Sequence, residues 1–451
     1  MARPRLPYRA VLTPRRRLSL GAGAAVLAAG VTASLVAGIA PSATVLAAAP
    51  STAVLGPAAD RPGTAAGGPG SAEADAPARS RSTIDSSLEG RLADRLRRST
   101  AGRYGMVVSI EGVGVVATLN PRGAMRPAST QKLFTTLPHL LDYPDRRLVT
   151  DVAVVGKPVA GILQGDLVVH ASADPSMLKR HFNSLARQVR HAGIRRVTGH
   201  LVLDIGNLPR HTRQRGWKSS FIPWDVGPLS PFPVWEDVWR HDRHYISHPT
   251  RSNLALFRAR LAQAGVKVVG SSSIVRTSTA TDVVAVHRSA PMRELVKHTL
   301  RISDNFYAEQ LLAIEGGHTR VKQLTADAGV SDVTYATDGS GLSYDDRESP
   351  RGEVQLLNYA TTTPAIDDLR AAMPRACRSG TLRHRFCGTI GAGAVRAKTG
   401  TLTHSTALAG YTTDARGRRV TFSVITAGVR SISAAVKATD RAVLVLRRYA
   451  G

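Results

Sequence analysis

The sequence predicts an α/β protein, an α-β-α sandwich with an antiparallel sheet and an inserted accessory α/β region. Helix-like repeats lie near both ends of the foldable part, which begins near Thr83. Runs rich in β-branched residues follow the first repeat and precede the last one. Residues 150–285 carry a second alternation of strand-like and helix-like segments. The elements near the two ends are predicted to form one sheet with helices packed on both of its faces. The middle region is predicted to be an insert.

The first elements predict a helix followed by a hairpin. Apolar residues recur every four positions from Ile84 to Leu96, as on one face of a helix. The β-rich runs Met106–Ile110 and Val113–Leu119 are separated only by Glu111 and Gly112, which favours a tight antiparallel connection. These elements supply one helix and two strands of the sandwich.

The C-terminal part is expected to complete the same domain. Residues 83–149 and 286–451 would then fold together, with Lys398 at a sheet edge. Helices are expected at Lys132–Leu141, Arg293–Leu300, Phe306–Glu315 and Ser431–Tyr449, and antiparallel strands at Val395–Lys398, Ala407–Asp414 and Arg419–Thr426.

The insert, residues 150–285, is expected to be an accessory α/β region. It separates residues 83–149 from residues 286–451 by far more residues than a minimal core needs. Its strands are predicted at Leu167–His170, Val197–Asp204 and Val266–Val269, and its helices at Leu185–Ala192 and Asn253–Ala264.

The N-terminus has the features of an export segment. Three arginines, Arg15 to Arg17, precede an apolar, uncharged run from Leu18 to Ala40, and small residues follow at Ala47–Ala49. Residues 1–49 are therefore predicted to be a signal peptide or an N-terminal membrane anchor. Residues 50–82, rich in Ala, Pro and Gly, are predicted to be a disordered linker.

The charge balance indicates an anionic partner. The 451-residue chain has a formal net charge of +27 at pH 7, mostly from arginine. No basic helix with groove-facing spacing and no RNA-binding aromatic pattern is present, which argues against nucleic acid. For an exported chain, an anionic cell-envelope surface is the expected partner, and the protein is expected to be extracytoplasmic. A basic surface without a specific partner is the alternative.

Three short motifs, in order, predict the chemistry. They are Ser129-Thr130-Gln131-Lys132, Ser303-Asp304-Asn305 and Lys398-Thr399-Gly400-Thr401. Each alone is weak, since such residues also occur as helix caps, loops and strand ends. Together they match the Ser-x-x-Lys, Ser-x-Asn and Lys-Thr-Gly signature of penicillin-recognising serine acyltransferases.

Ser129 and Lys132 are the predicted nucleophile and base. Residues three apart on a helix share a face, so the amine can reach the hydroxyl. Burial and a neighbouring cation, Lys398, are expected to lower the pKa of Lys132 so that it can take the proton. No Gly-x-Ser-x-Gly sequence supports a Ser-His-Asp hydrolase instead.

The other motif residues are predicted to move the proton and hold substrate. Ser303 would relay the proton to the leaving amine, and Asn305 would hold a substrate carbonyl and Lys132. The backbone N–H groups of Ser129 and Thr401 would form the oxyanion hole. The predicted substrate-binding residues are Thr399, Gly400, Thr401 and Asp304.

From about Thr83 to Tyr449 the sequence resembles the class C low-molecular-mass penicillin-binding proteins, which are D-alanyl-D-alanine carboxypeptidase/endopeptidases. Besides the catalytic motifs, the matching segments are Pro127–Leu133, Gly165–Val169, Asp338–Ser343, Gly380–Leu382 and Lys398–Leu402. The resemblance implies a transpeptidase-like, β-lactamase-like fold with inserted domains. It also implies a serine peptidase that cleaves D-Ala-D-Ala termini or cross-links of peptidoglycan stem peptides, with β-lactam antibiotics as inhibitors.

The sequence departs from the family pattern inside the insert. Ala171-Ser172-Ala173 stand before Asp174-Pro175 where the family usually has glycines, and Trp217–Trp239 matches poorly. The departures are expected to affect accessory surfaces rather than acyl transfer.

Two other functions use the same sequence features. A β-lactamase shares the motifs and needs a glutamate for rapid deacylation; Glu315 and Glu348 are present, but outside a recognisable motif. A catalytically inactive cell-wall-binding protein would explain the charge.

No cofactor or metal is expected. His241, His244 and His248 cluster near Asp242 without a second ligand pair. The two cysteines, Cys377 and Cys387, are expected to form a disulfide, because an exported chain meets an oxidising environment.

Overall fold

The computed structural model describes residues 84–97, 102–237, 246–330 and 335–451. The predicted leader, residues 1–49, and linker, residues 50–82, lie outside the described residues and stay predictions. Within the described residues, no helix combines the length and the apolar character that crossing a membrane requires.

The first sheet has five antiparallel strands in the order β12-β13-β14-β1-β2. The hairpin strands are β1 (Arg103–Ile110) and β2 (Gly114–Leu119), as the sequence predicts. The others are β12 (Arg396–Leu402), β13 (Ser405–Thr413) and β14 (Arg419–Ala427). β1 pairs with β14 from Arg103 opposite Ala427 to Ile110 opposite Val420, so the two ends of the folded chain share this sheet. β12 is the edge strand, with Lys398 paired to Ala409.

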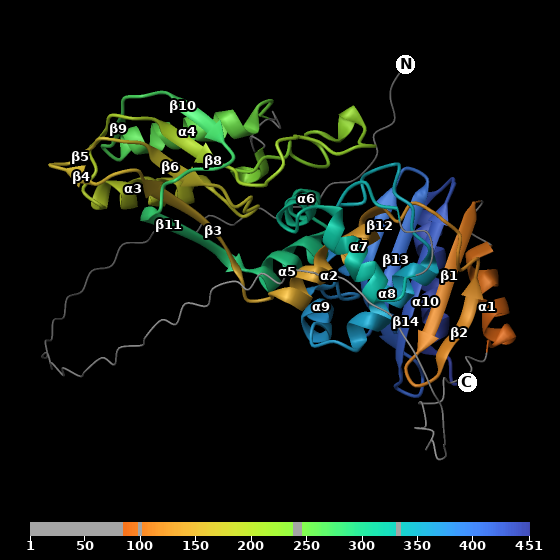
Figure 1. Cartoon of the computed structure of the whole chain (residues 1–451). Coiled ribbons are helices and arrows are strands. Elements are labelled where there is room, and N and C mark those ends of the chain that lie inside the picture. Colours follow the sequence, from red (N-terminus) through yellow and green to blue (C-terminus); the bar gives the residue numbers. More distant parts are fainter. Residues whose placement is uncertain (1–83, 98–101, 238–245, 331–334) are drawn as a thin grey trace, which may run out of the picture. The chain divides into compact units, whose positions relative to one another are not determined.

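Helices cover both faces of this sheet (Figure 1). On one face, α1 (Ser86–Arg97) and α10 (Ile432–Arg447) bury apolar side chains, among them Leu92 and Phe422. On the other face, a separate core contains Phe134 and Tyr411. Among its helices are α2 (Lys132–Asp142), α5 (Met292–Ile302), α8 (Pro350–Thr361) and α9 (Ile366–Ala372). The predicted α-β-α sandwich is confirmed. Ile84, predicted to lie on the helix, precedes α1 and is 43% exposed.

The second sheet lies in the middle of the chain, in the order β10-β8-β6-β3-β11. Its strands are β3 (Arg147–Val154), β6 (Leu167–His170), β8 (Leu201–Asp204), β10 (Ser272–Val275) and β11 (Asp282–Pro291). Helices α3 (Lys179–His191) and α4 (Pro249–Gln263) share a buried core with it. The insert boundaries at 150 and 285 stay a prediction; the paired strands β3 and β11 begin and end slightly outside them.

The predicted strand Val197–Asp204 is two strands in two sheets. β7 (Arg196–Val197) belongs to a small sheet with β4 (Pro158–Val159), β5 (Ile162–Leu163) and β9 (Lys267–Val268), whereas β8 belongs to the larger sheet. The strand is interrupted around Gly199, where a Cβ atom would lie 2.4 Å from the carbonyl oxygen of Gly165. Only glycine allows this close backbone approach.

The remaining described elements are short or support the site. They are η1 (Ala128–Gln131), η2 (Ser219–Phe221), η3 (Trp235–Asp237), α6 (Asn305–Ile314), α7 (His318–Asp327) and η4 (Gly380–Leu382). A disulfide joins Cys377 to Cys387 around η4, with the two Cα atoms 5.0 Å apart.

Candidate active site

Ser129 lies in the short 3-10 turn η1, immediately before α2. Its Oγ atom lies 3.0 Å from Nζ of Lys132. Its side chain caps neither η1 nor α2, because neither element has a side-chain cap hydrogen bond. The half-buried hydroxyl is therefore oriented by an amine rather than by a helix end.

Lys132 is completely buried, and two oxygen atoms besides Ser129 hold its amine. Nζ donates to Oδ1 of Asn305 and to the carbonyl oxygen of Ser340, both at 2.6 Å. A neutral amine has two hydrogens and one lone pair. The two acceptors take both hydrogens and leave the lone pair for the hydroxyl of Ser129.

Burial lowers the pKa of Lys132 to about 8, against the opposing effect of nearby carboxylates, of which Asp338 has the largest. Losing solvation disfavours the charged ammonium, so a useful fraction of the amine is neutral near neutral pH. A shift in this direction suits a general base.

The second motif lies where α5 meets α6. Ser303 ends α5 in the left-handed conformation, with φ 64°. This backbone conformation directs the side chain of Ser303 toward β12, where Nζ of Lys398 donates to its Oγ at 2.8 Å. Asn305 begins α6, contacts Lys132 through Oδ1, and donates from Nδ2 to the carbonyl oxygen of Asp225 at 2.8 Å.

Lys398 is the second buried amine of the site, with no exposed surface. It also donates to the carbonyl oxygen of Thr399 at 2.7 Å. Burial, and then the charge of Lys132, hold the pKa of Lys398 well below its usual range. The sequence predicted two causes for a lowered pKa at Lys132, burial and Lys398; burial is the largest cause in the structure, and the other groups that act on this pKa are carboxylates that raise it.

The edge strand β12 carries the predicted substrate-binding residues. Gly400 is buried against the turn that carries Ser129, and a Cβ atom there would lie 2.5 Å from the carbonyl oxygen of Pro127. Thr401 is exposed. Thr399 donates from Oγ1 to Oγ1 of Thr381, on η4, at 2.7 Å. The sequence analysis did not single out Thr381, although it lies in the Gly380–Leu382 segment of the resemblance.

Asp304 is not brought together with these groups. Its Oδ1 accepts from the backbone N–H of Tyr307 at 3.0 Å and caps α6, while Oδ2 lies 3.1 Å from Nε2 of His298. Both oxygens therefore have partners within the fold. This carboxylate fixes the turn that carries Ser303 and Asn305.

The segment Asp338–Ser343 holds the amine of Lys132 through the carbonyl oxygen of Ser340. Asp338 accepts from the backbone N–H groups of Gly341 and Ser343, at 2.6 and 2.7 Å. Glu309, on α6, accepts from the backbone N–H groups of Gly339 and Ser340 at 3.1 and 2.8 Å. Two buried carboxyl groups therefore hold the loop whose carbonyl group binds the amine of Lys132.

The loop touches η1, the turn that carries Ser129, directly. Gly341 has φ +78°, and a Cβ atom there would lie 1.8 Å from the carbonyl oxygen of Ala128, the residue before Ser129. Glycine is required here for both conformation and space. The sequence alone showed a turn with glycines but not this contact.

The poorly matching stretch that begins at Trp217 reaches this site. Nε1 of Trp217 donates to Oδ2 of Asp338 at 2.7 Å, and the carbonyl oxygen of Asp225 binds Asn305. Trp217 and Phe221 also share an apolar cluster with Ala128. The expectation that this stretch concerns accessory surfaces is therefore incomplete, because it forms part of the wall of the site.

The described residues hold neither a carboxylate on Ser129 Oγ nor a group of three metal-binding side chains. Glu315 contacts His139 at 2.9 Å and hydrogen-bonds Tyr143, and the backbone N–H of Glu348 pairs with Met125. His248 precedes α4, whereas His241, Asp242 and His244 lie outside the described residues.

Comparison with known proteins places this chain in one family. The model of the D-Ala-D-Ala carboxypeptidase 3 (S13) family matches residues 84–224 and 243–449. Carboxypeptidase DacB of Mycolicibacterium smegmatis is 31% identical over 402 residues, covering 82% of this chain and 85% of that protein. D-alanyl-D-alanine carboxypeptidase DacB of Haemophilus influenzae is 25% identical, covering 68% and 81%. The crystal structure of penicillin binding protein 4 from H. influenzae shares the fold, with a TM-score of 0.72 at 22% identity over 79% of this chain and 99% of that one.

Proposed function

Because the chain belongs to the D-Ala-D-Ala carboxypeptidase 3 (S13) family and is a serine DD-peptidase, we propose that Ser129 is its nucleophile and Lys132 its general base. One observation carries this assignment. Nζ of Lys132 has two fixed acceptors, Asn305 and Ser340, and its remaining direction meets Oγ of Ser129 at 3.0 Å. The neutral amine can then take the hydroxyl proton as the oxygen attacks.

The reaction follows from these positions. Oγ of Ser129 forms a bond to the carbonyl carbon of the penultimate D-Ala, and its proton passes to Lys132. The backbone N–H groups of Ser129 and Thr401 stabilise the oxyanion. The C–N bond breaks, and the proton held by Lys132 passes through the hydroxyl of Ser303, which Lys398 orients at 2.8 Å, to the leaving nitrogen, so that Lys132 is neutral again. Water then hydrolyses the ester and frees Ser129.

Two buried amines can share this site because they need not both be charged. Burial lowers the pKa of each, and the charge on Lys132 lowers that of Lys398 further. We assign the neutral state to Lys398, because burial and the charge of Lys132 both lower its pKa. It then orients Ser303 without adding a second positive charge beside Lys132.

The edge of β12 is the proposed binding surface for the substrate. Gly400 allows the strand to approach the turn of Ser129, and the hydroxyls of Thr399 and Thr401 suit the terminal carboxylate. Thr381 joins this set through its hydrogen bond to Thr399. Asp304, with both oxygens engaged, is assigned the cap of α6 instead of a substrate contact.

The substrate is a peptidoglycan stem peptide, and β-lactams are the expected acylating inhibitors. A structure of penicillin binding protein 4 from H. influenzae in complex with a β-lactam shares the fold at 20% identity. Carboxypeptidase and endopeptidase action use the same acyl-enzyme. They differ only in whether a terminal D-Ala or a cross-linked peptide leaves.

The chain is proposed to work outside the cytoplasm. The apolar run from Leu18 to Ala40 supports export, with residues 1–49 either removed or kept as an anchor. The net charge of +27 supports contact with an anionic envelope surface rather than with nucleic acid.

The test compares Ser129→Ala with Ser433→Ala, an exposed serine on α10 that serves as the matched control. Wild type and control should bind a fluorescent penicillin covalently and release D-Ala from a D-Ala-D-Ala pentapeptide. Ser129→Ala should do neither. Undiminished labelling of Ser129→Ala would refute the assignment.

Product masses separate the remaining functions. Cleavage of cross-linked muropeptide shows endopeptidase action, and release of D-Ala alone shows carboxypeptidase action. Rapid turnover of the penicillin, without a lasting adduct, would indicate a β-lactamase. Peptidoglycan binding that Ser129→Ala leaves unchanged, with no D-Ala release by wild type, would indicate a wall-binding protein without activity.

A further inference from the structure

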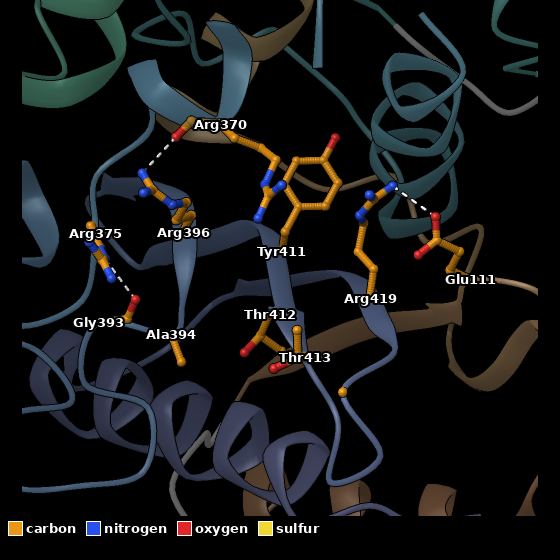
Figure 2. A pocket seen from close by; sticks show the side chains of 11 residues that line it. Glu111, Arg370, Arg375, Gly393, Ala394, Arg396, Tyr411, Thr412, Thr413 and Arg419 are labelled. Atoms are coloured by element: carbon orange, nitrogen blue, oxygen red, sulfur yellow. Dashed lines mark hydrogen bonds and ion pairs between the residues drawn. The ribbon is translucent and has the colours of Figure 1, made fainter. Parts of the chain in front are cut away.

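A second cavity, of about 360 Å³, lies at one end of the five-stranded sheet (Figure 2). The first residue of β12, the last residues of β13 and the first residue of β14 line it, together with α9 and the loops around Arg375 and Gly393. It is separate from the catalytic hydroxyl, since β12 begins at this end with Arg396 and continues to the substrate edge at Thr401. The lining side chains discussed below are Arg370, Arg375, Arg396, Arg419, Thr412 and Glu111.

Four guanidinium groups surround this cavity, and one of them forms an ion pair with a carboxylate. Nη1 of Arg419 lies 3.0 Å from Oε1 of Glu111. Arg396 and Arg375 donate to backbone carbonyl groups, those of Arg370 at 3.0 Å and Gly393 at 2.7 Å. Within the described part of the chain, Arg370, Arg375 and Arg396 form no ion pair. The cavity therefore carries three positive charges without a counter-ion.

This arrangement is unfavourable without a ligand. Burial, and then the charges of Arg375, Arg370 and Arg301, lower the pKa of Arg396. Like charges held close together, partly out of water, repel one another, and a bound anion would relieve this repulsion.

Two polar atoms of the lining have no partner among the described residues. Oγ1 of Thr412 is buried without a hydrogen bond, and the residue is only 3% exposed. Nε of Arg370 is also buried without a hydrogen bond. Buried polar groups normally have partners, so these two atoms leave the polar groups beside the cavity incompletely satisfied within the protein.

The rest of the lining leaves space for such a ligand. Gly393, Ala394 and Gly417 carry no side chain beyond a methyl group. The arginines approach from different elements, as Figure 2 shows: Arg370 from α9, Arg396 from β12, and Arg375 from the loop between them. Donors spread around a cavity suit a tetrahedral group with several oxygens better than a planar carboxylate, which one guanidinium can saturate.

We propose that this cavity binds a phosphate group of an anionic ligand, through Arg370, Arg375 and Arg396. The phosphate belongs either to a phosphodiester polymer or to a small phosphate compound, and the recognising chemistry is the same. The inference is independent of peptidase activity, because none of these residues belongs to the proposed catalytic set.

Binding is tested by calorimetry on the full-length chain at about 150 mM salt, where weak surface attraction is largely screened. The probes are inorganic phosphate, a poly(glycerol phosphate) oligomer, and a polyglutamate of equal charge. Arg370→Gln with Arg375→Gln removes two cavity charges. Arg187→Gln with Arg430→Gln removes two exposed charges elsewhere and is the matched control.

The cavity double variant should weaken phosphate binding at least tenfold, and the control pair less than twofold. Tighter binding of the oligomer than of inorganic phosphate identifies a polymer as the source, and equal binding identifies a small phosphate compound. Equal losses in both double variants, no phosphate binding by wild type, or equally tight binding of polyglutamate would overturn the proposal.

Fluorescent-penicillin labelling checks the fold of each variant and should stay unchanged. If the cavity double variant fails to label, Ala394→Asp decides instead, because it places a carboxylate among intact arginines. It should abolish phosphate binding while labelling persists, and phosphate binding as tight as in wild type would reject the site. A failure of Ser129 as nucleophile leaves this binding test unaffected.

Discussion

The carbonyl oxygen of Ser340 lies 2.6 Å from Nζ of Lys132, although the two residues are 208 positions apart in the chain. A backbone carbonyl group accepts a hydrogen and cannot donate one. The contact therefore fixes one N–H of the amine and helps to direct its lone pair toward Ser129. We therefore propose that the Asp338–Ser343 loop acts on catalysis through Lys132, as a positioning element.

The pH dependence of acylation should follow the protonation of Lys132. Burial lowers its pKa to about 8. The neutral amine is the form that can take a proton. It is then present in roughly a tenth of the protein molecules at pH 7 and in roughly nine tenths at pH 9. The second-order rate constant for acylation by a penicillin should therefore rise about tenfold over this range, as measured by stopped-flow fluorescence. A flat or falling profile would contradict the role of Lys132.

Gly341→Ala should disrupt the support of Lys132. The new Cβ atom would meet the carbonyl oxygen of Ala128 at 1.8 Å, at a φ of +78°. Unfolding free energy should fall by about 2–4 kcal/mol, measured in urea. The acylation rate should fall roughly 100-fold, because small displacements of reacting groups are costly.

Gly316→Ala is the matched control for this glycine. Gly316 has φ +77°, but nothing lies within 4 Å of its added Cβ. It should lose only about 1 kcal/mol, from backbone strain, and keep its acylation rate. Similar acylation by both variants would show that the loop does not position the amine.

Thr381→Val should reduce recognition of a free terminal carboxylate. The substitution keeps the shape of the side chain but removes the hydroxyl that hydrogen-bonds Thr399 at 2.7 Å. The ratio of kcat/KM for a free D-Ala-D-Ala terminus to that for its C-terminal amide should fall about tenfold, as for loss of one hydrogen bond. Thr381→Ser should retain the ratio, and a Val variant with the wild-type ratio would exclude Thr381 from the binding surface.

The disulfide should stabilise the loop that carries Thr381. Replacing Cys377 and Cys387 together by serine opens a loop with a sequence separation of 10. The free energy of unfolding should fall by about 2–4 kcal/mol in urea, because the unfolded chain gains freedom. Wild type in reductant is the control and should match the double variant. Equal stability of the variant and oxidised wild type would show that the bridge contributes nothing.

Much of the fold could be predicted because its signals are local. The periodicity up to Leu96 predicts α1, and Glu111-Gly112 between two β-rich runs predicts the β1–β2 hairpin. The split of Val197–Asp204 could not be predicted, because it depends on the approach of Gly165, in the bend between β5 and β6, to Gly199.

The sequence by itself determined which side chains are proposed to react: the motif order singled out Ser129, Lys132, Ser303, Asn305 and Lys398, since hydroxyls, amines and an amide are properties of side chains. Only the tertiary structure decided how those groups are held. It turned Asp304 into a helix cap, brought Ser340 to Lys132, and gathered Arg370, Arg375 and Arg396 around one cavity. The physical reason is that pKa values, charge repulsion and hydrogen-bond partners depend on burial and distance, and folding sets both between residues far apart in the chain.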